Sequence, residues 1–207
     1  MKVTIISDTH GQHEELGDLS GDVLIHCGDM EGIFSSEADA LSKIDSWFAR
    51  QDFEHILFVG GNHDFKLEQL FKSGATPLSH ATFLHDTYKV IDGFKFYGSS
   101  WVPQLGSHAF YASEPELDKA WQKIPQDTDV LITHTPPAGK LDQSSRGLKL
   151  GCTHLAKRVK NIRPKLHCFG HVHASAGQVT EDETIFLNAS SVNSGFSIAY
   201  PPYEFEF

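Results

Sequence analysis

Five apolar runs in this chain each end in side chains that can bind a metal ion. The runs cover residues 2–7, 22–27, 55–59, 129–133 and 166–169, and each has the length of one buried strand. The polar residues that follow them are Asp8 and His10, Asp29, Asn62 and His63, His134, and His171 and His173. Core packing does not require carboxylate, amide and imidazole groups at five strand ends. Because ligands collect beyond the carboxyl ends of strands in α/β sheets, the recurrence predicts one shared polar site.

The segment Gly170-His171-Val172-His173 has the densest group of candidate ligands. Two imidazoles at positions i and i+2 of an extended segment point to the same side, where they could serve one ion or one ion each of a pair. Gly170 permits a tight backbone turn just before them. The chain contains 13 histidines, so this pair is informative only together with the other strand ends.

The remaining patterns predict an α/β fold of mixed sheets in one domain over residues 1–207, rather than a purely parallel Rossmann arrangement. Helices are expected over 36–48, 65–72, 113–121 and 152–162, the first with Ser36 as its N-cap and Asp39 three residues on. Residues 81–84, 88–91 and 94–97 are expected to form successive antiparallel strands, with a hairpin turn at Asp92-Gly93. Later strands are expected near 177–180, 184–187 and 197–200, and the alternating tail 201–207 is typical of an edge strand.

The charge distribution constrains the partners of the chain. The net charge of -10 argues against binding of duplex nucleic acid, although residues 140–165 contain eight Lys and Arg and only one acid. Within that basic stretch Arg146 lies in a predicted loop and is the candidate for contacting an anionic substrate. The sequence does not indicate an oligomeric state.

Other sequence features predict a cytoplasmic protein that does not enter a membrane. No segment approaches the roughly 20 apolar residues of a membrane span, and the apolar run at the N-terminus is too short for a signal peptide. Cys27, Cys152 and Cys168 are odd in number and fit no zinc-knuckle spacing, which indicates reduced thiols.

The mixture of candidate ligands indicates the kind of metal. Asp and His side chains with one Asn carbonyl favour a borderline divalent ion, with manganese preferred and iron, zinc, cobalt or nickel as alternatives, whereas an all-oxygen set would favour calcium or magnesium. Seven side chains exceed the needs of one tetrahedral zinc and suit two ions about 3.5–4 Å apart. The two ions would outweigh the charges of Asp8 and Asp29, so the pocket would favour a phosphate-bearing substrate. A hydroxide between the ions could attack phosphorus in line.

These motifs resemble a known family. Asp8-x-His10, Gly28-Asp29, Gly60-Gly61-Asn62-His63-Asp64, His134 and Gly170-His171-Val172-His173 are similar in order and spacing to the signature of the calcineurin-like metallophosphoesterases, from about Met1 to Asn188. The segment Thr133-His134-Thr135-Pro136-Pro137 and the basic loop after it resemble the metallophosphoesterase-domain-containing class III phosphodiesterases.

The resemblance implies a four-layer α/β/β/α sandwich with a dinuclear site. Carried over by motif position, Asp8, His10, Asp29 and His173 would hold the first ion, while Asn62, His134 and His171 would complete the second, with Asp29 as the bridge. His63 would bind no metal but would stabilise or protonate the leaving oxygen, and Asp64 would orient the His63 ring.

The expected activity is therefore hydrolysis of small phosphodiesters such as nucleotides. Two alternatives stay open: a phosphomonoesterase or protein phosphatase that uses the same metals, and a metallophosphoesterase-shaped scaffold without activity. Trp101, Phe110 and Tyr111 lie in an irregular stretch, where they form either a small satellite core or a platform on which a base stacks. His108 and five other histidines outside the motifs are expected to be surface or structural residues.

Overall fold

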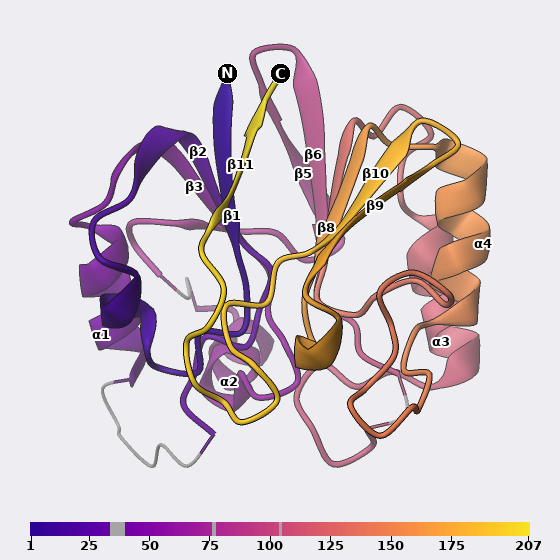
Figure 1. The fold of residues 1–207 in the computed structure, drawn as a ribbon, viewed down its shortest axis with the longest axis horizontal. Helices are drawn as coiled ribbons and strands as arrows, with labels where there is room; N and C mark the ends of the chain where they lie inside the picture. The colour runs from indigo at the N-terminus through magenta and orange to yellow at the C-terminus, as the bar shows by residue number, and fades with distance from the viewer. Residues whose placement is uncertain (34–39, 76–77, 104) are drawn as a thin grey trace.

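The computed structural model describes residues 1–33, 40–75, 78–103 and 105–207. Two β-sheets face each other at its centre, and helices cover the outer face of each sheet (Figure 1). The predicted start of the first helix, with Ser36 and Asp39, lies outside the described residues. The predicted helix is confirmed over α1 (Ala40–Phe48), which buries Ile44, Trp47 and Phe48 on one face.

The first sheet has the strand order β11-β1-β2-β3-β4. Its strands are β1 (Lys2–Ile6), β2 (Ser20–His26), β3 (Asp52–Phe58), β4 (Thr82–Phe83) and β11 (Tyr203–Glu206). The strands β1 to β4 are parallel, and β11 pairs antiparallel with β1 as the edge strand that the alternating tail predicted. The expected antiparallel strand at 81–84 was wrong: β4 is two residues long and runs parallel to β3. Its position places the partly buried Phe83 ring 5.1 Å from the Phe58 ring.

The second sheet has the strand order β5-β6-β7-β8-β10-β9. Its strands are β5 (Thr87–Ile91), β6 (Phe94–Ser99), β7 (Val130–Thr133), β8 (Leu166–Phe169), β9 (Gly177–Glu181) and β10 (Thr184–Asn188). The hairpin turn at Asp92-Gly93 is confirmed, with φ of 49° and 81° at its two residues. The expected strand at 197–200 was wrong, because the chain there closes a tight loop with a single bridge between Val192 and Ile198.

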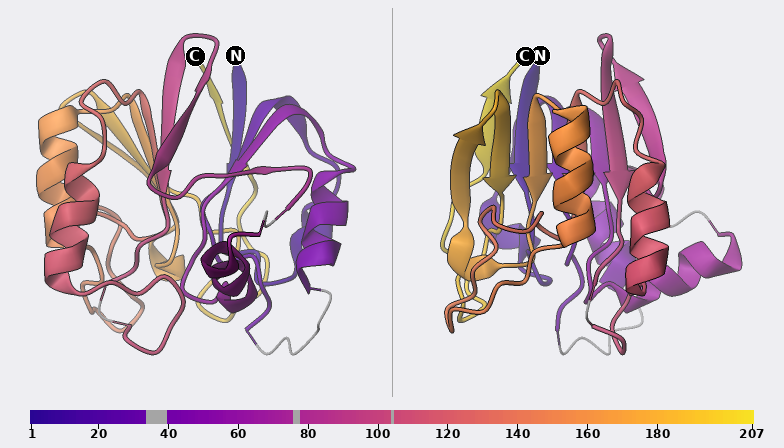
Figure 2. Two further views of the ribbon diagram at one scale, coloured as in Figure 1. Left: turned by 180° about the vertical axis from the view of Figure 1, so that it is seen from behind. Right: turned by 90° about the vertical axis from the view of Figure 1, so that its right-hand side faces the viewer.

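Three apolar clusters establish the four-layer α/β/β/α sandwich expected from the sequence. The cluster between the sheets includes Ile5 and Ile25 from the first sheet and Val130 and Ile132 from the second. The outer face of the first sheet packs against α1 and α2 (Phe65–Ser73), and that of the second against α3 (Glu114–Gln122) and α4 (Thr153–Ile162). The left view of Figure 2 shows α1 and the pair α3 and α4 on opposite sides of the molecule. Both faces of the central strands are therefore buried, which explains their continuous apolar runs.

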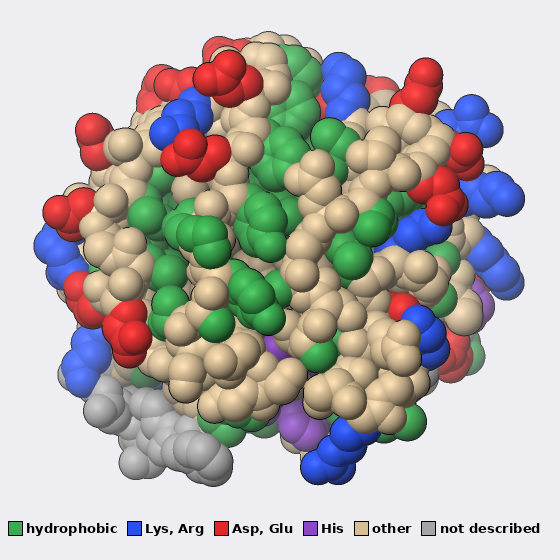
Figure 3. Space-filling view, in the orientation of Figure 1, with side chains coloured by type: hydrophobic (Ala, Val, Ile, Leu, Met, Phe, Trp, Pro, Cys, Tyr) green, Lys and Arg blue, Asp and Glu red, His purple; other side chains and the backbone are tan. Residues whose placement is uncertain are grey.

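The connections place all the predicted ligands at one end of the molecule. The parallel strands β1, β2 and β3, and in the other sheet β7 and β8, end on the same side (Figure 1). At this end of the molecule, histidine side chains reach the surface in Figure 3. The short 3-10 helices η1 (His13–Leu16) and η2 (His173–Ser175) follow β1 and β8 at this end, while the two chain termini lie side by side at the opposite end (Figure 1). Among the described residues, no helix has the length and apolar character needed to cross a bilayer.

Candidate metal centre

Four of the predicted ligands have a left-handed backbone conformation. The φ angles are 53° at Asp8, 45° at His10, 55° at Asp29 and 69° at His171. Such angles cost roughly 1–3 kcal/mol each for residues other than glycine and persist where surrounding contacts impose them. Here the Asp8 amide donates to Gly28 O at 2.9 Å and the His10 amide to Asp29 O at 3.0 Å. The loops after β1 and β2 therefore hold each other in the conformation that directs these side chains inward.

The geometry expected for the two histidines after β8 was wrong. They do not belong to an extended segment, because β8 ends at Phe169, His171 has a left-handed φ of 69° and His173 begins η2. The His171 ring consequently points to Asn62, at 2.8 Å, and the His173 ring points to Asp8, at 3.3 Å. The Asn188 side chain donates to Val172 O at 2.8 Å and fixes the backbone between them.

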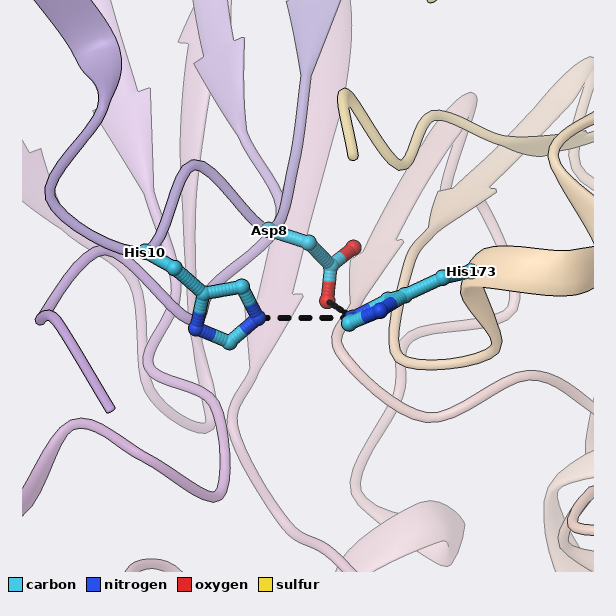
Figure 4. A group of neighbouring side chains, drawn as sticks. All are labelled: Asp8, His10 and His173. Atoms are coloured by element: carbon cyan, nitrogen blue, oxygen red, sulfur yellow. Dashed lines mark hydrogen bonds and ion pairs between the residues drawn. The ribbon is translucent and has the colours of Figure 1, made fainter. Parts of the chain in front are cut away.

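The first group of ligands is formed by Asp8, His10 and His173, whose potential ligand atoms lie within 4.8 Å of one another. The Nε2 atoms of His10 and His173 are 3.3 Å apart, and His173 Nε2 is 3.3 Å from Asp8 Oδ1 (Figure 4). Asp8 is held by the backbone amide of His171, which donates to both carboxylate oxygens at 3.0 and 3.1 Å. The three side chains come from two segments, and the segment with Asp8 and His10 is more than 160 residues from His173 in the sequence.

The second group brings together Asp29, Asn62, His134 and His171. Asn62 Oδ1 lies 3.0 Å from His134 Nε2 and 2.8 Å from His171 Nδ1. Asp29 Oδ2 lies 3.4 Å from His134 Nε2 and 3.8 Å from His10 Nε2, so this carboxylate contacts both groups. The structure therefore gathers all seven predicted ligands at one place, with Asp29 between the two groups.

The donor atoms of this cluster fit divalent metal ions. Asp8 and Asp29 are buried, and the Nε2 atoms of His10 and His173 face each other at 3.3 Å beside them. Carboxylate, imidazole and amide oxygen or nitrogen atoms that converge in this way suit a borderline ion such as manganese, iron or zinc. Asp8, His10, Asp29 and His173 could hold one ion, and Asp29, Asn62, His134 and His171 a second.

The ionisation of the cluster also favours metal binding. Although burial opposes it, the neighbouring histidines hold the pKa values of Asp8 and Asp29 well below the usual range. Burial lowers the pKa of His171 to about 3, so this ring is neutral and has a free lone pair at neutral pH. His134 differs, because Asp29 and Asp8 overcome the effect of burial and raise its pKa to about 9. Metal binding would release the His134 proton.

Two glycines allow the ligand loops to pack directly against each other. A Cβ atom at Gly170 would lie 2.1 Å from both Asp8 Oδ2 and Ser7 Oγ. A Cβ atom at Gly61 would lie 2.2 Å from Asp29 Oδ1. No larger residue fits at either position without displacing a candidate ligand.

Asp64 does not have the role that the sequence suggested. Its Oδ1 accepts hydrogen bonds from the amides of Met30 and Glu31, at 2.8 and 2.9 Å, and its Oδ2 from those of Asp29 and Gly61, at 2.9 and 2.8 Å. Its hydrogen bonds thus go to the backbone of the two ligand loops, not to the His63 ring. The carboxylate is a positioning group, because four amides of two loops converge on one side chain.

His63 lines the cavity beside the cluster, and its amide donates to Asp29 Oδ1 at 2.8 Å. Its ring meets the rings of His10 and His108 edge-on, at centroid distances of 5.3 and 5.6 Å. No sequence pattern indicated that His108 would lie here, since it belongs to an irregular stretch far from every motif. Burial lowers the pKa of His63, so the neutral ring dominates at neutral pH until a negative charge lies beside it.

A cavity of about 210 Å³ opens over the cluster. Its walls include Asp29, Asn62, His63, His171 and His173, together with Ser144, Ser145, Leu150, Ser194 and Phe196. Arg146, the predicted substrate contact, is exposed in the same loop but is not among the residues that line the cavity. The serines just before it, Ser144 and Ser145, line the cavity instead.

Of the two roles expected for Trp101, Phe110 and Tyr111, the structure supports packing in the core over a stacking platform at the cavity. Trp101, Phe110 and Tyr111 do not line it. Trp101 Nε1 donates to Asp86 at 3.2 Å, and Phe110 is buried against Gly60, so these two rings belong to the core. The aromatic ring in the cavity wall is that of Phe196, which no sequence pattern marked.

Comparison with known proteins gives the same family as the motifs. Residues 1–175 match the family described as calcineurin-like phosphoesterase. The chain is 36% identical to the UPF0046 protein K07C11.7 of Caenorhabditis elegans, over 99% of this chain and 74% of the relative. It is 29% identical to metallophosphoesterase domain-containing protein 1 of Homo sapiens, over 95% of this chain and 68% of the relative.

Solved structures support the fold. One superimposes with a TM-score of 0.68 at 17% identity, covering 90% of this chain and 89% of the other. A second, described as GAP50, the anchor in the inner membrane complex of Plasmodium, has a TM-score of 0.54 at 12% identity and covers 92% of this chain and 71% of its own. Motifs, fold and family match lead to one conclusion: this chain belongs to the calcineurin-like phosphoesterase family.

Proposed function

We propose that the protein is a metal-dependent phosphodiesterase that hydrolyses small phosphoesters such as nucleotides. The observation that carries this proposal is the convergence of the seven predicted ligands in two adjoining groups beside His63. Every ligand position carried over from the resemblance holds a side chain that can bind metal, and all of them lie in the cluster, which argues against an inactive scaffold.

The side chains divide the work of such a reaction. Two bound divalent ions, with manganese preferred at both positions, would activate water and neutralise the negative charge on the oxygens of the phosphoryl group. Asp8, His10 and His173 would hold one ion and Asn62, His134 and His171 the other, with Asp29 shared. Asp64 keeps the loops that carry Asp29 and Asn62 at a fixed spacing.

His63 is the proposed acid for the departing oxygen. Its ring lines the cavity and is not committed to Asp64. A phosphate beside it would counteract the effect of burial on its pKa and favour the imidazolium, which can then donate its proton to the leaving group. Ser144 and Ser145 add hydroxyl groups to the lining of the cavity, and Arg146 follows them in the chain as an exposed residue.

The size of the site supports small substrates. A cavity of about 210 Å³ lies below the usual range of roughly 300–1,000 Å³ for ligand pockets, so it accommodates a phosphoryl group and part of one organic substituent.

The three cysteines of the chain are buried free thiols, and we place the reaction in the reducing cytoplasm.

The test compares two substrates that share one leaving group. Manganese-loaded protein should hydrolyse bis-p-nitrophenyl phosphate with a higher kcat/KM than p-nitrophenyl phosphate, and metal analysis should find two ions per chain. Asp29→Asn and His171→Ala should lose both turnover and one or more ions, whereas His55→Ala, which changes a histidine of β3 outside the cluster, should change neither. A clear preference for the monoester would overturn the diesterase assignment, and undiminished hydrolysis by Asp29→Asn would refute the metal site.

A further inference from the structure

Phe196 has an unusual combination of exposure, contact and backbone conformation. Its side chain is 43% exposed although it lines the cavity over the metal centre. Its ring meets the His10 ring at 5.3 Å and the His173 ring at 5.0 Å, both edge-on. The Phe196 ring thus contacts two candidate metal ligands and also faces the cavity. A substrate bound at the metal centre would lie beside it.

The loop around Phe196 holds the ring in this place. The Phe196 amide donates to Asn193 O at 2.9 Å, and the Gly195 amide to Asn193 Oδ1 at 2.8 Å. From the other side of the site, Gln12 Nε2 donates to Phe196 O at 3.0 Å. The hairpin 192–198 is thereby connected to the segment that contains His10.

The backbone conformation at Phe196 is costly for a phenylalanine. Its φ is 61°, in the left-handed region that glycine and asparagine adopt with least strain. Glycine would satisfy the turn better, and the ring stays 43% exposed where it contacts His10 and His173. The side chain therefore has a use that the fold alone does not explain.

From this geometry we propose that Phe196 forms a subsite for the ring-bearing substituent of the substrate, a nucleobase or another aryl group. This inference rests on the proposed phosphoesterase function and adds a specificity to it. The metal centre binds the phosphoryl group, and the phenyl face beside it stacks on a flat ring, as aromatic side chains do with any base. The lining residues of the cavity include no lysine or arginine, so recognition of the organic group depends on stacking and on the serines.

Binding of two ligands that differ only in the base tests the subsite. Adenosine monophosphate and ribose 5-phosphate present the same phosphorylated sugar, so the ratio of their Kd values, measured by calorimetry on the manganese-loaded chain, reports the contact to the base. The wild-type ratio should be roughly 5- to 150-fold, which corresponds to about 1–3 kcal/mol at 1.4 kcal/mol per tenfold. Phe196→Gly should bring the ratio close to one and leave the Kd of ribose 5-phosphate unchanged.

Two further variants separate a missing ring from a damaged fold. Phe196→Tyr keeps a flat ring and should keep the wild-type ratio, whereas Tyr88→Ala, which removes an exposed ring on β5, should not alter it. Phe196→Gly should unfold at the same temperature as the wild type or higher, since the strained φ suits glycine.

The outcomes distinguish this inference from the proposed function. If bis-p-nitrophenyl phosphate is hydrolysed but Phe196→Gly keeps the wild-type ratio, the subsite is wrong and the phosphoesterase stands. If no phosphoester is hydrolysed but the ratio collapses in Phe196→Gly, the subsite stands and the assigned reaction fails.

Discussion

Replacing Asp64 by asparagine should destabilise the protein by about 3–6 kcal/mol, although the two side chains have nearly the same size. The carboxylate is completely buried and accepts four backbone hydrogen bonds, two on each oxygen. An amide keeps one accepting oxygen and turns an NH₂ group toward the other two donors. Two hydrogen bonds to a charged acceptor are lost, at about 1.5–3 kcal/mol each. Against a typical folding stability of about 5–15 kcal/mol, this is a large fraction.

The measurement is urea unfolding with linear extrapolation, with and without manganese. Asp45→Asn is the matched control, because Asp45 Oδ1 also accepts two amides, from Ser79 and His80 at 2.9 Å each, but near the surface. Asparagine keeps that oxygen, so the control should lose less than about 1 kcal/mol.

One result would refute the reasoning about Asp64. Burial and the negative charges of Asp29 and Glu31 raise the pKa of Asp64, and the backbone donors oppose this rise. If the side chain were protonated in the fold, one amide would have no acceptor and asparagine would be a mild change. A loss below about 1 kcal/mol in Asp64→Asn would therefore show that the four amides do not depend on a carboxylate.

Two other predictions follow from the same region. Gly170→Ala should remove at least one metal ion per chain in elemental analysis, because the new methyl group would lie 2.1 Å from Asp8 Oδ2; full metal occupancy would contradict this. Stability should also fall as the pH drops below about 6.5, because burial lowers the pKa values of His26 and His167 to about 3 and only the unfolded chain binds these protons readily. The loss approaches about 1.4 kcal/mol per pH unit for each histidine, and unfolding free energies that stay constant between pH 7 and pH 5 would disprove it.

The identity of the ligands could be predicted from sequence because the signal is local. An apolar run such as 129–133 predicts a buried strand, and the residue directly after it, His134, has to lie at the strand end. Five strand ends with the same property require only that the strands be parallel neighbours, which an α/β pattern makes the default.

The backbone of the ligand loops could not be predicted in this way. The left-handed φ of His171 depends on its amide, which donates to Asp8 from the other sheet. Likewise, Asp64 is adjacent to His63 in sequence, but its hydrogen-bond partners are the amides of Gly61 and of three residues more than 30 positions away. Those three are Asp29, Met30 and Glu31. Hydrogen bonds between distant loops leave no periodic trace in the sequence.

The sequence also could not predict which aromatic residue lines the cavity. Trp101 and Phe110 lie in an irregular stretch for which the sequence left both core packing and base stacking open, and contacts with His85 and Gly60 hold the two rings in the core. Phe196 follows the last motif by more than 20 residues, and it reaches the cavity only because the hairpin 192–198 crosses from the second sheet toward the first. The path of the chain between the two sheets, and not a local sequence pattern, therefore determines which aromatic ring lines the cavity.

The path of the chain after β10 connects the proposed Phe196 subsite to an edge strand of the first sheet. After the hairpin that carries Phe196, only a few residues separate it from β11, a four-residue edge strand with one partner, β1. Edge strands fray at lower free energy than the centre of a fold, while β1 and β2, which present Asp8 and Asp29, are paired on both sides. On gentle warming, such a molecule would first stop discriminating between ring-bearing and plain phosphoesters, and would lose the ability to cleave them only at a higher temperature.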